Sequence, residues 1–189
     1  MMELKYSEVL KLNKELGNNL KSSSYDITVL SNIIVHQSKE MLEYSLRGEG
    51  INANVKFGDY DNIVQDSKKY QDSNAVIIFW ELFNIVDGLQ FKIELLNNDQ
   101  LDEIFEKTKS EIDLVLKNLE KTSLVLINKF TSLHFCSFDI RKNNLEVLAD
   151  QLNQYLENRI PANVRLVELE KVIANTGLDN SLDLRYYYS

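Results

Sequence analysis

The sequence contains little of what disulfide scaffolds, metal-binding fingers and membrane spans require. Its 189 residues include one cysteine, Cys136, and two histidines. A single cysteine excludes an intrachain disulfide and a CxxC metal site. No apolar run approaches the ~20 residues that cross a bilayer, and the first residues lack the basic and apolar tandem of a signal peptide. We therefore expect a cytoplasmic protein with no membrane partner.

Positive charge is also scarce. Lysine and arginine number 21 against 29 aspartates and glutamates, which gives a formal net charge of −8. A surface of this sign does not suit a nucleic-acid backbone or an anionic membrane. The sequence also has no HExxH motif, no glycine-rich phosphate loop and no carboxylate cluster with metal-ligand spacing. These features predict no nucleic-acid partner, no metal and no cofactor.

The remaining composition is that of one folded domain covering residues 1–189. Hydrophobic residues make up 44% and charged residues 26% of the chain, which is enough for one well-buried core. Hydrophobic periodicity predicts helices over residues 3–22, 37–48, 60–70, 81–95, 99–120, 144–158 and 168–176. Apolar or β-branched runs predict strands over 26–30, 54–57, 75–80, 123–127 and 164–167, and residues 128–142 are predicted as a loop.

Alternation of strands and helices predicts an α/β fold with a five-stranded parallel sheet. The run from Ala75 to Trp80 has six apolar residues without alternation, as expected for a strand covered on both faces. Right-handed crossovers place helices on both sides of such a sheet, and 2-1-3-4-5 is the commonest order for five strands. We therefore expect a three-layer sandwich of flavodoxin-like topology with an additional N-terminal helix.

Ligands of open parallel sheets bind outside the carboxyl ends of the strands, and Ser31 and Asn32 follow the first predicted strand. A serine hydroxyl beside a helix N-terminus can act as a nucleophile in acyl transfer if a base reaches it. Serine and asparagine are also the preferred N-cap residues, so a purely structural role is the alternative.

Other candidates follow the second and third predicted strands. Gly58 could let its backbone approach a ligand, or it could be an ordinary turn glycine. Glu81 and Asn84 are one helical turn apart and could point into the mouth of a site, or they could form a solvated first helical turn.

The two histidines, His36 and His134, are the candidate general bases. His36 lies five residues beyond Ser31, and His134 lies in the long loop after the fourth strand. A surface or packing role is the alternative for both.

Four segments carry a resemblance to a known family: Val29–Asn32, Gly50–Tyr60, Ala75–Leu82 and Asp183–Tyr187. They resemble the N-terminal region of FkbH-like proteins, which has an SGNH-hydrolase-like fold and precedes a HAD-type domain. The resemblance implies handling of acyl or glyceryl groups, with an acyl carrier protein or a small acyl or sugar substrate as partner. It also implies a role in polyketide or surface-polysaccharide biosynthesis.

In this resemblance Ser31 matches the SGNH serine, Gly58 matches the glycine of the second block, and Asn84 lies near the third-block asparagine. The usual Asp-x-x-His near the C-terminus is missing, because no histidine follows His134. Two functions stay open. Ser31 could serve a transferase or hydrolase with His134 as its base, or the domain could be a noncatalytic module that binds a carrier protein or substrate for a downstream HAD domain.

The C-terminal residues Tyr186, Tyr187 and Tyr188 are unusually aromatic for a free tail. We expect the natural polypeptide to continue past Ser189 into the HAD-type domain. A receiver-like signalling domain of the same topology is a third possibility, but it expects acidic residues where Ser31 and Asn32 stand.

Overall fold

The five predicted strands form one parallel sheet in the computed structural model, which describes residues 5–133 and 141–181. The strands are β1 (Tyr25–Ser31), β2 (Ala53–Phe57), β3 (Ala75–Phe79), β4 (Leu124–Asn128) and β5 (Val164–Val167). Their order is β2-β1-β3-β4-β5, and every neighbouring pair is parallel. The predicted fold class and strand order are therefore confirmed.

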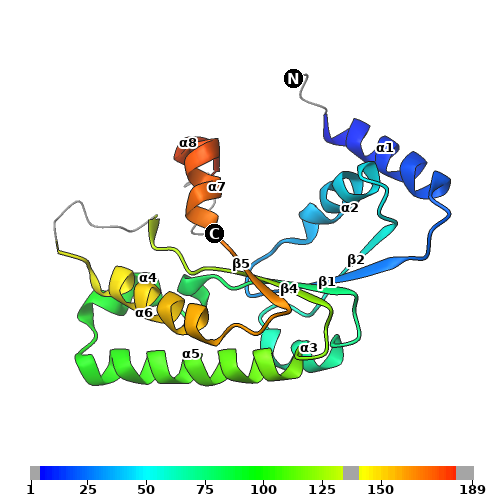
Figure 1. The fold of residues 1–189 in the computed structure, drawn as a ribbon. Coiled ribbons are helices and arrows are strands. Elements are labelled where there is room, and N and C mark those ends of the chain that lie inside the picture. The colour runs from blue at the N-terminus through cyan, green and yellow to red at the C-terminus, as the bar shows by residue number, and fades with distance from the viewer. Residues whose placement is uncertain (1–4, 134–140, 182–189) are drawn as a thin grey trace.

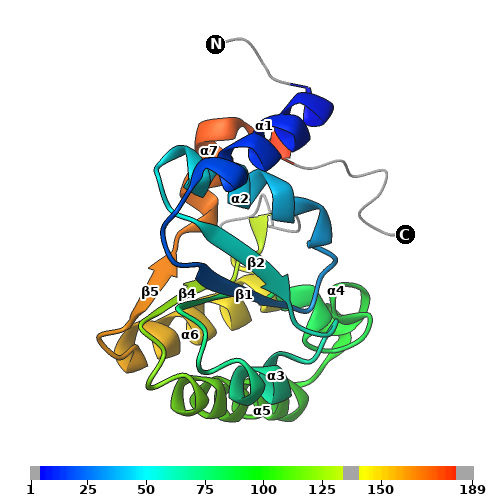
Figure 2. The same cartoon turned by 90° about the vertical axis from the view of Figure 1, so that its right-hand side faces the viewer.

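Helices cover both faces of this sheet (Figures 1 and 2). On one face lie α3 (Ile63–Lys69), α5 (Asn98–Asn118) and α6 (Asn144–Arg159). On the other face lie α1 (Tyr6–Asn19), α2 (Lys39–Gly48) and α7 (Leu169–Thr176), with α1 stacked on α2. The short elements are η1 (His36–Ser38), η2 (Leu82–Asn84), α4 (Leu89–Lys92), η3 (Ile93–Leu95) and α8 (Leu178–Ser181).

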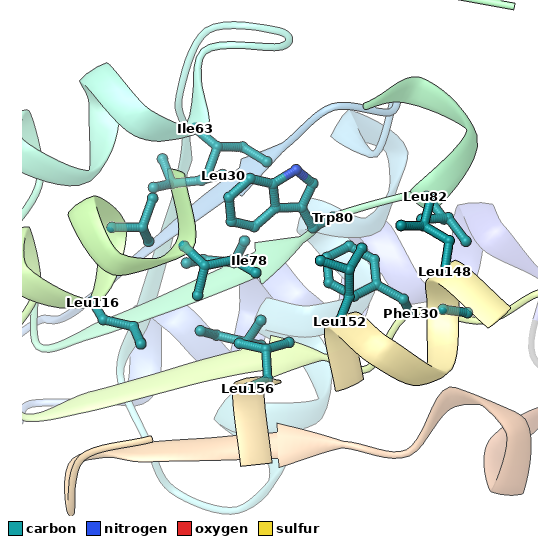
Figure 3. Close-up of a cluster of buried hydrophobic side chains, with 14 of the residues drawn as sticks. Leu30, Ile63, Ile78, Trp80, Leu82, Leu116, Phe130, Leu148, Leu152 and Leu156 are labelled. Atoms are coloured by element: carbon teal, nitrogen blue, oxygen red, sulfur yellow. The ribbon is translucent and has the colours of Figure 1, made fainter. Parts of the chain in front are cut away.

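Two separate cores result from this layering, because alternate residues of each strand point to opposite faces. The larger core packs Leu30, Ile78 and Trp80 of the sheet side against α3, α5 and α6 (Figure 3). The smaller core packs residues such as Val29 and Val55 under α2. Burial on both faces explains why the central strand β3 is a continuous apolar run.

One predicted helix is wrong. Residues 81–95 form three short pieces, η2, α4 and η3, instead of a continuous helix. Gly88 adopts a left-handed conformation with φ of 65°, which an α-helix does not contain. The chain therefore turns at Gly88, and the apolar periodicity of this segment serves separate short turns.

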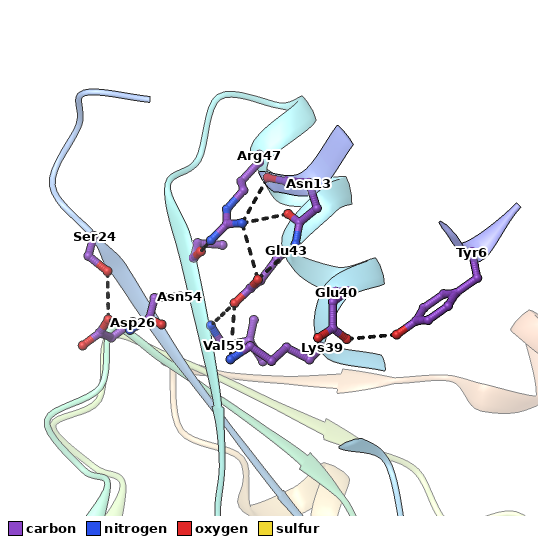
Figure 4. A network of polar contacts seen from close by, with 11 residues as sticks. Tyr6, Asn13, Ser24, Asp26, Lys39, Glu40, Glu43, Arg47, Asn54 and Val55 are labelled. Carbon is purple, nitrogen blue, oxygen red and sulfur yellow. Dashed lines mark hydrogen bonds and ion pairs between the residues drawn. The ribbon is translucent and has the colours of Figure 1, made fainter. Parts of the chain in front are cut away.

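Side chains of α2 form hydrogen bonds with the backbone of the edge strand β2 (Figure 4). A carboxylate oxygen of Glu43 accepts from the Val55 N–H at 3.0 Å, and the Arg47 guanidinium donates to the Ala53 carbonyl at 2.8 Å. Arg47 also donates to the Asn13 side chain of α1 at 2.8 Å. This buried network satisfies edge groups that could otherwise pair with another chain, and it fixes α1 on α2.

Candidate functional site

The carboxyl ends of β1 and β3 form the switch point of this sheet, where doubly wound folds bind ligands. The sequence candidates Ser31, Asn32, Glu81 and Asn84 all lie there, at the end of β1 or just after β3. The fold therefore brings these four together at one edge.

The Asn32 side chain is hydrogen-bonded to the backbone of Glu81, just after the end of β3. Its Oδ1 accepts from the Glu81 N–H at 2.7 Å, and its Nδ2 donates to the Glu81 carbonyl at 2.8 Å. The Asn32 carbonyl in turn accepts from Asn84 Nδ2 at 2.7 Å. Asn32 and Asn84 thus lock two strand exits together through these three hydrogen bonds.

Two further asparagines repeat this two-bond pattern along the same edge. Asn128 accepts from the Trp80 N–H at 2.7 Å and donates to the Trp80 carbonyl at 3.0 Å. Asn153 of α6 accepts from the Phe130 N–H and donates to the Phe130 carbonyl, both at 2.8 Å. We call the three residues Asn32, Asn128 and Asn153 the asparagine clamps. They extend the sheet pairing beyond the strand ends through side chains and make the edge a rigid platform.

Ser31 is not an N-cap, and its hydroxyl is hydrogen-bonded to a backbone carbonyl. It is the last residue of β1, 9% exposed, and its hydroxyl donates to the Ile33 carbonyl at 2.7 Å. The N-cap interpretation is wrong, because the next helical turn begins only at His36 and the Ser31 hydroxyl binds a carbonyl instead of a helix N–H. Within residues 5–133 and 141–181, no side chain of a general base is hydrogen-bonded to this hydroxyl.

The histidines supply no base to this serine in the described chain. His36 is exposed and its ring lies 4.6 Å from the ring of Phe57. This contact fits the packing role that was the alternative for His36. His134 lies outside the described residues, so its predicted role as a base stays a prediction.

Glycine is required at position 58 because the side chains of Leu30 and Asp66 lie close to its Cα. An ordinary turn glycine would not need this space. The Gly58 N–H donates to the Val29 carbonyl at 2.9 Å. A Cβ at this position would lie 2.7 Å from a Leu30 methyl and closer still to the Asp66 carboxylate. Asp66 is buried and accepts from the Asp59 N–H at 2.6 Å, which holds the β2 exit turn on α3.

The carboxyl group of Glu81 is largely buried and accepts hydrogen bonds from backbone N–H groups of the residues that follow it. Burial raises the pKa of Glu81, and hydrogen bonds from the Phe83 and Leu82 N–H groups lower it by less. Its Oε1 is buried with no hydrogen-bond partner. The solvated first turn is therefore wrong for Glu81, since solvent would leave its pKa unshifted. Its predicted position at the mouth of a site stays a prediction.

Glu81→Gln is expected to raise the free energy of unfolding near neutral pH. The pKa of Glu81 is higher in the folded protein than in the unfolded chain, so the folded state binds the proton more tightly. Its stabilising contribution is complete below the unfolded pKa and is lost as pH rises through the folded pKa. Denaturant unfolding across this range should give a difference between the proteins that disappears in acid. Glu120→Gln, at an exposed position, is the control, and a destabilised Glu81→Gln protein would contradict the expectation.

A small polar cavity opens beside these clamps, between the exits of β2 and β3 and helix α5. Its volume is about 170 Å³, and it is lined by Asp61, Ile63, Val64, Gln65, Trp80, Asn84, Ile85, Lys107 and Glu111. The Asp61 N–H donates to the Ser31 carbonyl at 3.1 Å, so the cavity wall is built directly on the end of β1. We call this space the switch-point cavity.

The charges of the switch-point cavity nearly balance. The Nζ atom of Lys107 lies 3.8 Å from Oε1 of Glu111, which is one turn further along α5. Burial raises the pKa of Glu111, the Lys107 charge lowers it, and the Asp61 charge raises it again. Two carboxylates, one ammonium and the amides of Gln65 and Asn84 therefore offer both acceptors and donors to a ligand.

Sequence reasoning missed Asp61, Lys107 and Glu111. Lys107 and Glu111 belong to the polar face of a long amphipathic helix, where charged residues are ordinary. Asp61 has a positive φ of 54°, which is unusual for a residue other than glycine and could not be read from its type. Only the packing of α5 against α3 and the β3 exit brings them together.

The described residues contain neither a metal-binding cluster nor a membrane-spanning helix. Within residues 5–133 and 141–181, no group of three histidine, cysteine, aspartate or glutamate side chains could hold a metal ion. In the same part of the chain, no helix combines the length and apolar character of a membrane span.

Comparison with known proteins finds a likeness in structure alone. No protein-family description matches the sequence, and no curated protein matches it. A solved structure with a TM-score of 0.68 and 13% identity is the N-terminal part of the protein BF1531 from Bacteroides fragilis, described as containing a phosphatase domain complexed with Mg. The match covers 98% of this chain and 50% of that chain, so this chain spans about half its length. At this identity the likeness supports the fold.

Proposed function

We propose that this chain is a noncatalytic substrate-binding domain of FkbH-like type, which holds a glyceryl or related acyl group for a HAD-type domain of a longer protein. The observation that carries the proposal is the occupation of the strand-exit groups. Ser31 donates to the Ile33 carbonyl, Gly58 to Val29 and Asn84 to Asn32. Catalysis at an acyl group needs an activated nucleophile and free donors aimed at the oxyanion, and here these groups donate to the protein's own carbonyls.

The switch-point cavity supports binding of a small hydroxylated group. Asp61 and Glu111 accept hydrogen bonds from hydroxyl groups, while Lys107 and the amides of Gln65 and Asn84 donate to a carbonyl or hydroxyl oxygen. A glyceryl group offers both kinds of partner, whereas an unsubstituted acyl chain has no hydroxyl group to donate to the carboxylates of Asp61 and Glu111. The structural likeness to a protein about twice as long that contains a phosphatase domain agrees with the longer protein that we propose.

Trp80 provides a direct test, because it is the only tryptophan and it lines the cavity. Its fluorescence should change saturably with a glyceryl thioester of pantetheine, and the acetyl thioester should bind at least about 10-fold more weakly, which corresponds to ~1.4 kcal/mol. Asp61→Asn should weaken glyceryl binding by a similar factor. Asp72→Asn, at an exposed turn position, should leave it unchanged.

Catalysis is tested in parallel on the wild-type protein. A serine-directed fluorophosphonate should not label it, and hydrolysis of both thioesters should match that of Ser31→Ala. Labelling or turnover that disappears in Ser31→Ala would overturn the proposal in favour of a transferase- or esterase-type enzyme. Absence of any Trp80 response to the glyceryl thioester would remove the binding function.

A further inference from the structure

An apolar groove lies next to the switch-point cavity, between the segment after β3 and the N-terminal half of α5. Its volume is about 470 Å³, and its lining residues are Val86, Lys92, Leu96, Gln100, Glu103, Ile104 and Lys107. We call it the α4–α5 groove. Lys107 lines both the groove and the switch-point cavity, so the two spaces adjoin at this side chain.

Large apolar side chains stand in solvent along the same segment. Leu95 is 84% exposed and Phe91 is 68% exposed, and they lie four residues apart across α4 and η3. The turn at Gly88 and the N-cap at Asn97 fix both ends of the segment, which holds these side chains outside the core. Exposed apolar groups beside an apolar groove are typical of a surface that another protein covers.

The charge of the groove differs in sign from that of the chain. Its ionised lining residues are Lys92, Lys107 and Glu103, which sum to one positive charge, whereas the chain has a net charge of −8. Lys92 comes from α4 and Lys107 from α5, so each of these two helices contributes one ammonium group to the groove. A partner with an apolar stripe flanked by carboxylates complements this arrangement.

We infer that the α4–α5 groove docks an amphipathic helix with acidic flanks, which belongs to the carrier protein that presents the bound group. The inference rests on the function proposed above and adds the surface and the chemistry of the partner. Because the groove and the cavity share Lys107, a helix seated in the groove places a short tethered group beside the cavity mouth. Apolar side chains fill the space over Leu96 and Ile104, and acidic side chains pair with Lys92 and Lys107.

The inference is tested with a purified acidic acyl carrier protein that carries the glyceryl thioester on its pantetheine arm. Titration of the wild-type chain with this carrier should give saturable binding. The binding is measured as the change in fluorescence anisotropy of a dye attached to the carrier. Leu95→Glu and Lys92→Glu should each weaken it at least about 10-fold, and added salt should weaken wild-type binding further. Both positions lie outside the two cores, so the variants should unfold at the wild-type temperature.

Matched controls separate this surface from a general effect of charge. Val172→Glu on α7, at a position 54% exposed, and Lys14→Glu on α1 should bind the carrier as the wild type does. Equal binding by the groove variants and the wild type, or no carrier binding by a wild type whose Trp80 still responds to the glyceryl thioester, would overturn the groove and leave the proposed function standing. Carrier binding that depends on Leu95 and Lys92 without any Trp80 response would support the groove and contradict the cavity.

Discussion

Replacing Asn128 with alanine is expected to cost about 3–5 kcal/mol of unfolding free energy, because it leaves two buried backbone groups unpaired. Asn128 is 5% exposed and holds both the N–H and the carbonyl of Trp80, which is also 5% exposed. It donates a third hydrogen bond to the Lys129 carbonyl at 3.1 Å. Water cannot replace these partners without opening the larger core.

Denaturant unfolding followed by Trp80 emission measures this loss. Asn32→Ala should cost less than Asn128→Ala, because the Glu81 backbone that Asn32 clamps belongs to a half-buried residue. Asn18→Ala, at an exposed position of α1, should change stability by less than about 0.5 kcal/mol. A cost for Asn128→Ala as small as that of Asn18→Ala would contradict the clamp.

Gly58→Ala is expected to cost about 3 kcal/mol, because the added Cβ overlaps a Leu30 methyl and the Asp66 carboxylate. Moving Asp66 away would also break its hydrogen bond to the Asp59 N–H. Gly48→Ala is the matched control, since no atom lies within 4 Å of the added Cβ at that helical position. There alanine should stabilise the protein by about 0.5–1 kcal/mol.

A double-mutant cycle identifies the cause of this cost. In an Asp66→Ala background the Gly58→Ala substitution should cost only about 1 kcal/mol, because the carboxylate that it displaces is already gone. An unchanged cost in that background would contradict the role assigned to Asp66. If Gly58→Ala kept full stability and lost only the Trp80 response to the glyceryl thioester, the glycine would be a ligand-approach residue, as the sequence alternative allowed.

The prediction of the fold succeeded because it depended on averages over many residues. The apolar runs that become β3 and β4 need burial on both faces, and five such strands between helices allow few topologies. The helix predicted over residues 81–95 was wrong for a local reason. Its periodicity was real, but the left-handed conformation of Gly88 interrupts it, and a glycine in a sequence does not reveal its φ.

The positions of the candidate residues could be predicted from the sequence, whereas their hydrogen-bond partners could not. The position of Ser31 at the end of β1 followed from the strand pattern, and so did the gathering of Asn32, Glu81 and Asn84 at one edge. Their hydrogen-bond partners did not. The Asn32 side chain binds a backbone 49 residues away, and the sequence alone does not specify such long-range pairs.

The sequence by itself determined the parallel sheet, its strand order and the edge at which the candidate residues gather, because burial and chain connectivity depend on residue type and spacing. Only the tertiary structure decided that the polar residues of this edge lock the strand exits together, and that Asp61, Lys107 and Glu111 line the cavity beside them. The physical reason is that a hydrogen bond or a cavity depends on the relative positions of distant segments to within an ångström or less. Those positions follow from the packing of α3 and α5 on the sheet, which no local pattern records.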